Sequence, residues 1–209
     1  MSRDRLALEG PEGTLEAVLE GETESPAMIA IVCHPHPQFG GTMDNKVVTT
    51  LIRAARDAGA AALRFNFRGV GESQGAYSDG IGEVEDLIAV HRWLSKKYPN
   101  TPLWLAGFSF GSFVAARGAE VLAANGEAPA ALFLVAPPVH HYGFETIENV
   151  GCPVTVVQGE DDEVVPADKV FRWAESTALA PDLIRFPDSG HFFHGQLVNL
   201  REVASSRLP

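Results

Sequence analysis

The residues Gly107 to Gly111 follow the pattern G-x-S-x-G and place Ser109 at its centre. A short apolar run precedes them, so the pattern is typical of a sharp turn from a strand into a helix that presents a nucleophilic serine. Such a turn strains the backbone at the serine, and glycine on both sides avoids clashes of Cβ atoms. Because 20 of the 209 residues are glycine, composition alone also produces this pattern, and the rest of the chain must supply its context.

An Ala- and Gly-rich segment, Ser112 to Ala124, predicts the helix that follows this turn. The N-terminal N–H groups of such a helix stabilise negative charge that develops near the serine. The backbone N–H of Phe110, the residue after the serine, is therefore one predicted oxyanion donor. In the loop after the first buried strand, Pro35 and Pro37 have no N–H, so the backbone N–H of His36 is the second.

Carboxylate and imidazole side chains follow later strands at the same edge of the predicted sheet. Asp161 and Asp162 come after the strand Val154–Val157, and His191 comes after the strand Leu183–Phe186. In this arrangement the serine attacks an acyl carbonyl, the imidazole accepts and returns its proton, and a carboxylate orients the imidazole. Adjacent aspartates cannot both face one imidazole, so the spacing leaves the acid open between the two.

Strands alternate with helices along the chain. Two segments around a turn at residues 10–13, Arg5–Leu8 and Thr14–Glu20, alternate polar and apolar residues and predict an antiparallel hairpin at the sheet edge. The later strands are near-continuous apolar runs, which are typical of a parallel sheet with helices on both faces. These runs are Ala27–Cys33, Ala60–Phe65, Leu103–Ala106, Ala130–Ala136, Val154–Val157 and Leu183–Phe186. The predicted helices are Asp44–Gly59, Gly80–Tyr98, Ser112–Ala124, Ala167–Ala178 and Phe192–Arg207.

Length and composition predict one α/β domain, residues 1–209, with a sizeable core, because 45% of the residues are hydrophobic. The net charge of −11 argues against nucleic acid or an anionic membrane as partner. The first nine residues lack the apolar stretch of a secretory signal, and no run approaches the ~18 apolar residues of a membrane span. Together with only two cysteines, these features predict a soluble cytoplasmic protein.

Seven histidines offer alternatives to His191 as the base. His91 lies on a helix face, where a partly buried structural role is common, and His194 falls inside the predicted last helix. Four others lie near strand ends and are candidates for a metal site: His34, His36, His140 and His141. These histidines have neither the i, i+4 spacing on a helix nor the nearby cysteines that are typical of zinc sites, so we expect no metal. Gly69 and Gly71 resemble the start of a dinucleotide-binding motif, but Gln74 occupies the position of the third glycine in that motif. We therefore expect no cofactor.

With these residues in place, the sequence resembles the α/β-hydrolase family over nearly its whole length, and within it the small lidless esterases akin to dienelactone hydrolases. Residues 159–166 match the family's acid-loop pattern G-x-x-D-x-x-V-P, and residues 68–73 match its R-G-x-G-x-S turn. The chain departs from the family at Asn66, where relatives often carry aspartate, and at residues 34–37, His-Pro-His-Pro, which replace the commoner His-Gly start of the oxyanion loop. Alignment of the acid loop implies that Asp162 is the acid.

The resemblance implies a serine hydrolase that cleaves a small acyl ester through Ser109, His191 and Asp162. Thioesters, lactones and amides are cleaved by the same machinery, and no residue discriminates among them. A non-catalytic binding module is the alternative outside enzymes, because a fold alone does not prove activity. We expect a small acyl molecule as the partner, with no nucleic acid and no membrane.

The segment Pro137 to Cys152 is too short for the multi-helix cap that relatives often carry at this place. The sequence leaves two alternatives for it, a surface connection or a small flap beside Ser109. Either leaves the serine open to water, so we expect a preference for acyl groups of roughly two to six carbons, because each methylene left in water loses the ~0.8 kcal/mol of its burial. We also expect no activation at a lipid–water interface. The predicted walls of the pocket are Phe39, Phe110 and Tyr142.

Overall fold

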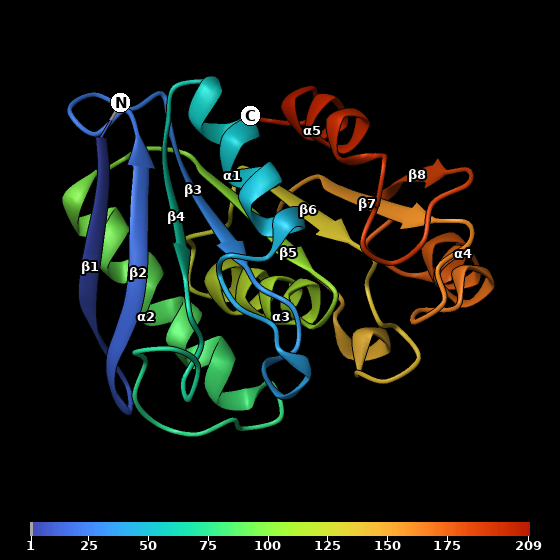
Figure 1. Cartoon of the computed structure of the whole chain (residues 1–209), viewed down its shortest axis with the longest axis horizontal. Helices are drawn as coiled ribbons and strands as arrows, with labels where there is room; N and C mark the ends of the chain where they lie inside the picture. Colours follow the sequence, from blue (N-terminus) through green and yellow to red (C-terminus); the bar gives the residue numbers. More distant parts are fainter. Residues whose placement is uncertain (1) are drawn as a thin grey trace.

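Eight strands form one mixed sheet in the order β1-β2-β4-β3-β5-β6-β7-β8 (Figure 1). This computed structural model describes residues 2–209. The strands are β1 (Ser2–Gly10), β2 (Gly13–Gly21), β3 (Met28–Cys33), β4 (Ala60–Phe65), β5 (Leu103–Phe108), β6 (Ala131–Val135), β7 (Val154–Gly159) and β8 (Asp182–Phe186). Strand β2 is antiparallel to β1 and β4, and the pairs among β3 to β8 are parallel. The predicted N-terminal hairpin and mostly parallel sheet are confirmed.

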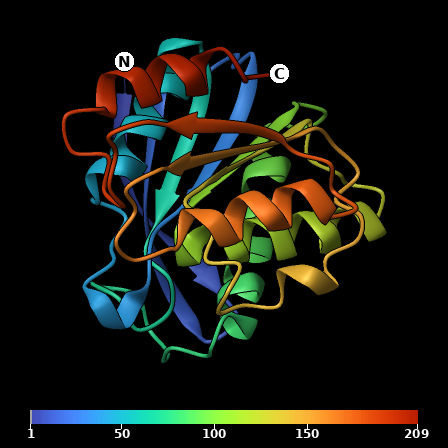
Figure 2. The same ribbon diagram turned by 90° about the vertical axis from the view of Figure 1, so that its right-hand side faces the viewer.

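Helices cover both faces of the sheet. They are α1 (Lys46–Asp57), α2 (Ile81–Lys97), α3 (Phe110–Ala124), α4 (Ala167–Ser176) and α5 (Leu197–Ser205), with short 3₁₀ helices η1 (Pro37–Phe39) and η2 (Phe144–Thr146). Helices α1 and α5 cover one face, and α2, α3 and α4 cover the other; in Figure 2, α5 (red) and α4 (orange) lie on opposite sides of the sheet. On β5, Trp104 packs with the α1–α5 side and the next residue, Leu105, with the other. Because successive side chains point to opposite faces, a strand covered on both sides must be apolar throughout.

The last predicted helix, Phe192–Arg207, is wrong at its start, because α5 begins only at Leu197. Phe193 and Gly195 have φ values of 53° and 77°. These values lie in the left-handed region, which a right-handed helix does not contain. The segment before α5 therefore forms turns, and His194 lies exposed in them instead of in a helix.

The predicted site residues collect at one edge of the sheet. His36 follows β3, Ser109 follows β5, Asp162 follows β7 and His191 follows β8. These strands are parallel, so their carboxyl ends open on the same side, where ligands of parallel sheets bind. Strand order alone thus brings together residues that are far apart in the sequence (Figure 1).

The connection between β6 and β7 contains no cap domain. Its only helical element is η2. Phe144, Ile147 and Val150 of this segment are buried in the core on the α3 side of the sheet. The segment is therefore a short packed loop, and its chain length leaves no room for a bundle of helices over the sheet edge.

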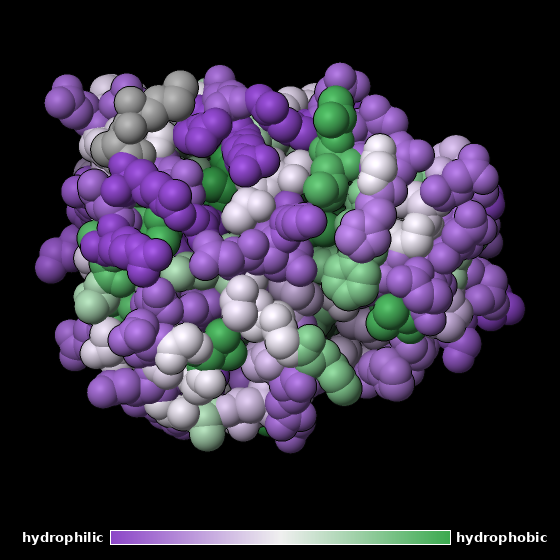
Figure 3. All heavy atoms as spheres, viewed as in Figure 1, coloured by the Kyte–Doolittle hydropathy of each residue, from purple (hydrophilic) through white to green (hydrophobic). Residues whose placement is uncertain are grey.

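The surface is polar on the face drawn in Figure 3, where hydrophobic residues appear only in small groups. Within residues 2–209, no helix combines the length and the apolar run that a bilayer crossing requires. Six large hydrophobic side chains of this part of the chain are exposed, and half of them, Phe39, Val164 and Phe192, border a single pocket. Exposed apolar side chains around one pocket are typical of a ligand-binding site.

His34, the residue after β3, is buried and joins the loops that follow β3 and β4. Its Nε2 accepts a hydrogen bond from the backbone N–H of Phe67 at 3.0 Å, and its Nδ1 lies 2.6 Å from the carbonyl oxygen of Pro35. Because a backbone N–H only donates and a carbonyl only accepts, Nδ1 carries the hydrogen and the imidazole is neutral. Burial lowers the pKa of His34 to about 4 from 6.5, although the bond to Pro35 opposes this shift.

Replacing His34 with glutamine tests this neutral link. In the unfolded chain His34 binds a proton near pH 6.5, and in the folded chain only near pH 4. The contribution of neutral His34 to the free energy of unfolding is therefore complete above about pH 6.5 and is lost as the pH falls toward about 4. For the wild type this loss reaches about 3 kcal/mol between about pH 7 and pH 4. His34→Gln should be less stable at neutral pH but lose less stability on acidification, measured by urea unfolding. Equal losses in both proteins would contradict the assignment.

Candidate active site

Ser109 lies at the junction of β5 and α3, with φ of 52° and ψ of −123°. This is a strained conformation for a residue other than glycine. Its backbone N–H donates to the carbonyl oxygen of Val135 at 2.8 Å, which fixes the serine to the end of β6. Helix α3 begins at Phe110, two residues before the predicted start at Ser112, so the helix follows the serine directly.

The two glycines of the G-x-S-x-G motif allow α3 to contact the strand ends. A Cβ atom on Gly107 would lie 2.1 Å from the carbonyl oxygen of Gly111. A Cβ atom on Gly111 would lie 2.4 Å from the carbonyl oxygens of both Cys33 and His34. These separations are far below van der Waals contact, so any side chain there would push α3 away from β3 and β5.

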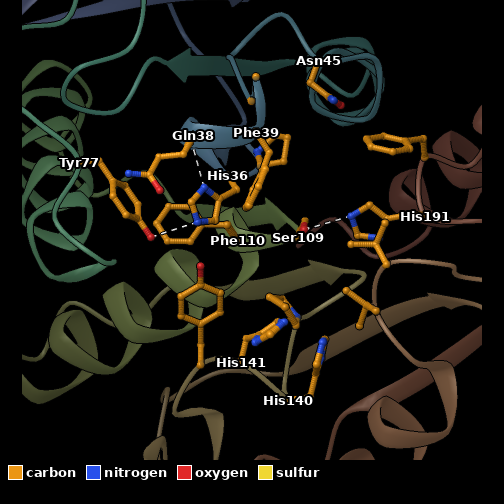
Figure 4. A pocket seen from close by; sticks show the side chains of 18 of the residues that line it. His36, Gln38, Phe39, Asn45, Tyr77, Ser109, Phe110, His140, His141 and His191 are labelled. Atoms are coloured by element: carbon orange, nitrogen blue, oxygen red, sulfur yellow. Dashed lines mark hydrogen bonds between the residues drawn. The ribbon is translucent and has the colours of Figure 1, made fainter.

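Three side chains form a continuous hydrogen-bonded chain across this edge of the sheet. Ser109 Oγ lies 3.1 Å from His191 Nε2 (Figure 4), and His191 Nδ1 lies 2.9 Å from Asp162 Oδ2. The serine and the histidine are buried, with 8% and 3% of their surfaces exposed. A carboxylate only accepts, so Nδ1 carries the hydrogen and Nε2 accepts from the serine hydroxyl. In this geometry an imidazole can remove the proton from an attacking serine.

The Asp162 carboxylate accepts four hydrogen bonds. Its Oδ1 accepts from the backbone N–H groups of Val164 at 2.9 Å and Val165 at 2.7 Å. Its Oδ2 accepts from Gln158 Nε2 at 3.0 Å and from His191. Burial raises the pKa of this carboxyl, but the hydrogen bond and the charge of His191, with the two backbone N–H groups, outweigh burial and lower the pKa below its usual value. Asp162 therefore stays ionised beside the imidazole.

Two residues that support this chain were missed by sequence reasoning. Gln158, at the end of β7, is fully buried, and its amide donates both to Asp162 and, at 3.3 Å, to the carbonyl oxygen of Val165. Glu163 is exposed, yet its Oε2 accepts from the backbone N–H of His191 at 3.1 Å. The one available signal was a glutamine directly after the predicted strand Val154–Val157.

The loop after β3 is held by the side chain of His36. Its Nδ1 accepts from the backbone N–H of Gln38 at 3.2 Å and so caps η1. Nε2 therefore carries the hydrogen of a neutral ring, and it donates to the hydroxyl oxygen of Tyr77 at 3.1 Å. Phe110, whose ring centroid lies 5.1 Å from that of His36, is the first residue of α3, so its N–H has no acceptor within the helix. The two predicted oxyanion donors thus belong to neighbouring residues, and their role stays a prediction.

A pocket of about 780 Å³ opens beside Ser109. Phe39, Phe110 and Tyr142, which the sequence indicates as pocket walls, all line it. Of the two alternatives for residues 137–152, neither describes the segment fully. Its first part, within residues 138–142, lines the pocket beside the serine, whereas Phe144, Ile147 and Val150 of its remaining part are packed into the core. The segment therefore forms a wall of the pocket and is anchored in the core.

Figure 4 shows how the pocket is divided around the serine. His191 lies on one side of Ser109, and the rings of His36, Tyr77 and Phe110 lie on the other. The hydroxyl of Ser109 therefore has the imidazole on one side and an aromatic wall on the other.

The other histidines do not build a metal site. Among residues 2–209, no group of three or more His, Cys, Asp or Glu side chains has the geometry to hold a metal ion. His91 Nε2 lies 2.9 Å from the hydroxyl of Ser95 one turn further along α2. His140 and His141 lie with their ring centroids 4.1 Å apart in the wall of the pocket.

Comparison with known proteins places the chain in a family. A family model described as alpha/beta hydrolase fold matches residues 35–151. The crystal structure of a serine hydrolase without a lid from Xanthomonas campestris is 39% identical, with a TM-score of 0.91, and the match covers 99% of this chain and 93% of that one. A serine hydrolase homologue from Coxiella burnetii is 41% identical, with a TM-score of 0.91 over 100% of this chain and 99% of its own. An uncharacterized protein of Rickettsia prowazekii is 38% identical over 170 residues, which are 79% of this chain and 70% of that protein. The chain belongs to the α/β-hydrolase fold family.

Substitution of Gly111 by alanine tests the close backbone contact at the serine. Gly111→Ala should lower the free energy of unfolding by about 1–3 kcal/mol, because the clash with backbone oxygens outweighs the better helix propensity of alanine. Gly143→Ala is the matched control. Gly143 has an ordinary φ of −69°, and a Cβ atom added there would lie 3.4 Å from the nearest atom, so this variant should keep its stability. Urea unfolding measures both variants. A Gly111→Ala protein as stable as the wild type would contradict the contact.

Proposed function

We propose that the protein is a serine hydrolase that cleaves a small acyl ester, with Ser109 as nucleophile, His191 as base and Asp162 as the acid that orients the base. The observation that carries this proposal is the hydrogen-bonded chain from Ser109 Oγ through His191 to Asp162, with steps of 3.1 and 2.9 Å. Membership of the α/β-hydrolase fold family supports hydrolysis, and the similar protein of Xanthomonas campestris is described as a serine hydrolase.

In the first half-reaction, Ser109 Oγ attacks the carbonyl carbon of the ester while its proton moves to His191 Nε2. The π electrons of the carbonyl move to its oxygen, and this oxyanion accepts hydrogen bonds from the backbone N–H groups of His36 and Phe110. When the tetrahedral intermediate collapses, the bond to the alcohol oxygen breaks and His191 gives the proton to that oxygen. The alcohol leaves, and the acyl group stays on Ser109.

In the second half-reaction, water replaces the alcohol. His191 Nε2 accepts a proton from the water as its oxygen attacks the acyl carbon, and the proton then passes to Ser109 Oγ as the acid product leaves. The carboxylate of Asp162 holds the hydrogen on Nδ1 throughout and stabilises the imidazolium that forms in each half-reaction. The four hydrogen bonds around Asp162 suit this role because they keep the carboxylate ionised and fixed in position.

The acyl group is proposed to be short. No cap domain covers the pocket, and Phe39 and Phe192 at its border are exposed to water, so a long chain would remain partly solvated. The same steps cleave a thioester or a lactone, in which the leaving atom is sulfur or stays tethered to the acyl group. A binding module without activity is less consistent with a complete and buried Ser-His-Asp chain.

Replacing Ser109 with alanine removes the nucleophile and leaves only binding and the N–H donors. The kcat/KM for p-nitrophenyl acetate should fall by a factor on the order of 10³ or more. Circular dichroism and urea unfolding should show that the variant is folded. Undiminished turnover by the folded Ser109→Ala protein would refute the proposed nucleophile.

The two neighbouring aspartates give a matched pair of variants. Asp162→Asn should lower kcat for p-nitrophenyl acetate by several powers of ten, because an amide donor facing Nδ1 favours the wrong tautomer of His191. Asp161→Asn makes the same chemical change one residue earlier, on an exposed side chain, and should have little effect. A larger loss in Asp161→Asn than in Asp162→Asn would move the acid to the other residue.

A further inference from the structure

One carboxylate, that of Asp79, lines the pocket together with the rings of His36, Tyr77, Phe110 and Tyr142. We propose that Asp79 and these rings bind an ammonium group carried by the ester substrate, on either its acyl or its alcohol part. The inference rests on the proposed function, because the ester must lie over Ser109 while its charged group reaches this side of the pocket. It goes further by assigning a charge to the substrate.

The rings form a packed wall. The centroid of His36 lies 4.9 Å from that of Tyr77 and 5.1 Å from that of Phe110, and the centroids of Phe110 and Tyr142 are 5.4 Å apart. All four residues line the pocket, and Figure 4 shows three of them, His36, Tyr77 and Phe110, grouped beside Ser109. The faces of aromatic rings carry negative potential and attract cations, and quaternary ammonium groups above all.

Asp79 lies in the turn that leads into α2 and lines the same pocket. Its φ of 50° lies in the left-handed region, which aspartate adopts more readily than most residues. Burial raises the pKa of Tyr77 and Tyr142 and lowers that of His36, and in all three the charge of Asp79 acts to raise the pKa. The carboxylate is therefore within electrostatic reach of three rings of the wall.

Among the described residues, the negative charge of Asp79 has no counterion. Across residues 2–209, Asp79 forms no ion pair, and no lysine or arginine lines the pocket. Histidines are the remaining basic residues there, and burial lowers the pKa of His36 and His140, which favours their neutral forms. An exposed carboxylate that lines an aromatic pocket and has no counterion among the described residues leaves a place for a cation supplied by a ligand.

Glu83 adds a second negative charge behind the wall. It is fully buried, and its carboxylate accepts from the backbone N–H groups of Ser78 at 2.9 Å and Gly80 at 2.8 Å. These bonds satisfy its oxygens at the start of α2, but its charge still acts to raise the pKa of Tyr77 and Tyr142. With a net charge of −11 on the whole chain, the potential at the pocket attracts cationic substrates and repels anionic ones.

The test uses two pairs of esters in which a trimethylammonium group is replaced by a tert-butyl group of the same shape. Acetylcholine and 3,3-dimethylbutyl acetate place this group on the alcohol. The p-nitrophenyl esters of 4-(trimethylammonio)butanoate and 5,5-dimethylhexanoate place it on the acyl part. Each kcat/KM is divided by the rate constant for hydrolysis of the same ester by hydroxide, which removes differences in intrinsic reactivity.

For the wild type at about pH 8, where an unperturbed imidazole is neutral, we expect a roughly tenfold preference for the cationic member of at least one pair. That pair identifies the part of the substrate that carries the charge. The preference should shrink at high ionic strength, because salt screens an exposed carboxylate. Equal kcat/KM for both members of both pairs would overturn the inference.

Two aspartates in the same backbone conformation supply the variants. Asp79→Asn should abolish the preference and leave kcat/KM for the neutral esters unchanged. Asp188→Asn, at φ of 52° on an exposed turn outside the pocket, alters the net charge equally and should keep the preference. Asparagine tolerates this conformation at both positions, so both variants should fold. A preference that survives in Asp79→Asn would overturn the inference.

Failure of the proposed function would be recognised separately. If the wild type does not hydrolyse p-nitrophenyl acetate, the hydrolase proposal fails, and binding is measured instead by NMR titration of the Ser109→Ala protein. Choline is compared with 3,3-dimethylbutan-1-ol, its uncharged analogue. Tighter binding of choline, lost in the Ser109→Ala, Asp79→Asn double variant, would support the cation site without any turnover. Equal or weaker binding of choline would refute the site.

Discussion

The close backbone contact between α3 and the ends of β3 and β5 is the constraint on which the rest of the site depends. No side chain fits at Gly107 or Gly111, so the helix starts directly after Ser109 and the serine takes its strained conformation. Hydrogen bonds on both sides sustain this strain: the N–H of Ser109 is bonded to β6, and His34 fixes the loop after β3. The serine, the start of α3 and the loop of His36 therefore have fixed relative positions.

Two carboxylates at the carboxyl edge of the sheet, those of Asp162 and Asp79, have different surroundings. Asp162 is surrounded by four hydrogen-bond donors, so its charge is stabilised within the protein and orients His191. Asp79 is exposed, lines the same pocket as the aromatic rings and has no counterion among residues 2–209. The first charge serves the geometry of the site, and the second is available to a ligand. This contrast separates the residues that we propose for the chemistry from those that we propose for substrate selection.

The sheet could be predicted from the sequence because buried parallel strands must be apolar on both faces, and their carboxyl ends necessarily meet at one edge. The same rule predicted that Ser109, His191 and one of two neighbouring aspartates would lie near one another, and the resemblance implied Asp162. The structure brings Ser109, His191 and Asp162 together, and their catalytic roles remain proposals. The start of α5 could not be predicted, since the positive φ of Phe193 comes from packing and not from a glycine at that position. Gln158 and Asp79 have no motif, and only tertiary contacts give them their places.

The most direct measurement of the central claim is covalent labelling of the folded protein with a fluorophosphonate, followed by mass spectrometry of its peptides. A serine activated by an adjacent imidazole attacks phosphorus, and the oxyanion donors stabilise the negative oxygen of the adduct. We expect one adduct per chain, on Ser109. An unlabelled folded protein, or an adduct on another serine with Ser109 unmodified, would contradict it.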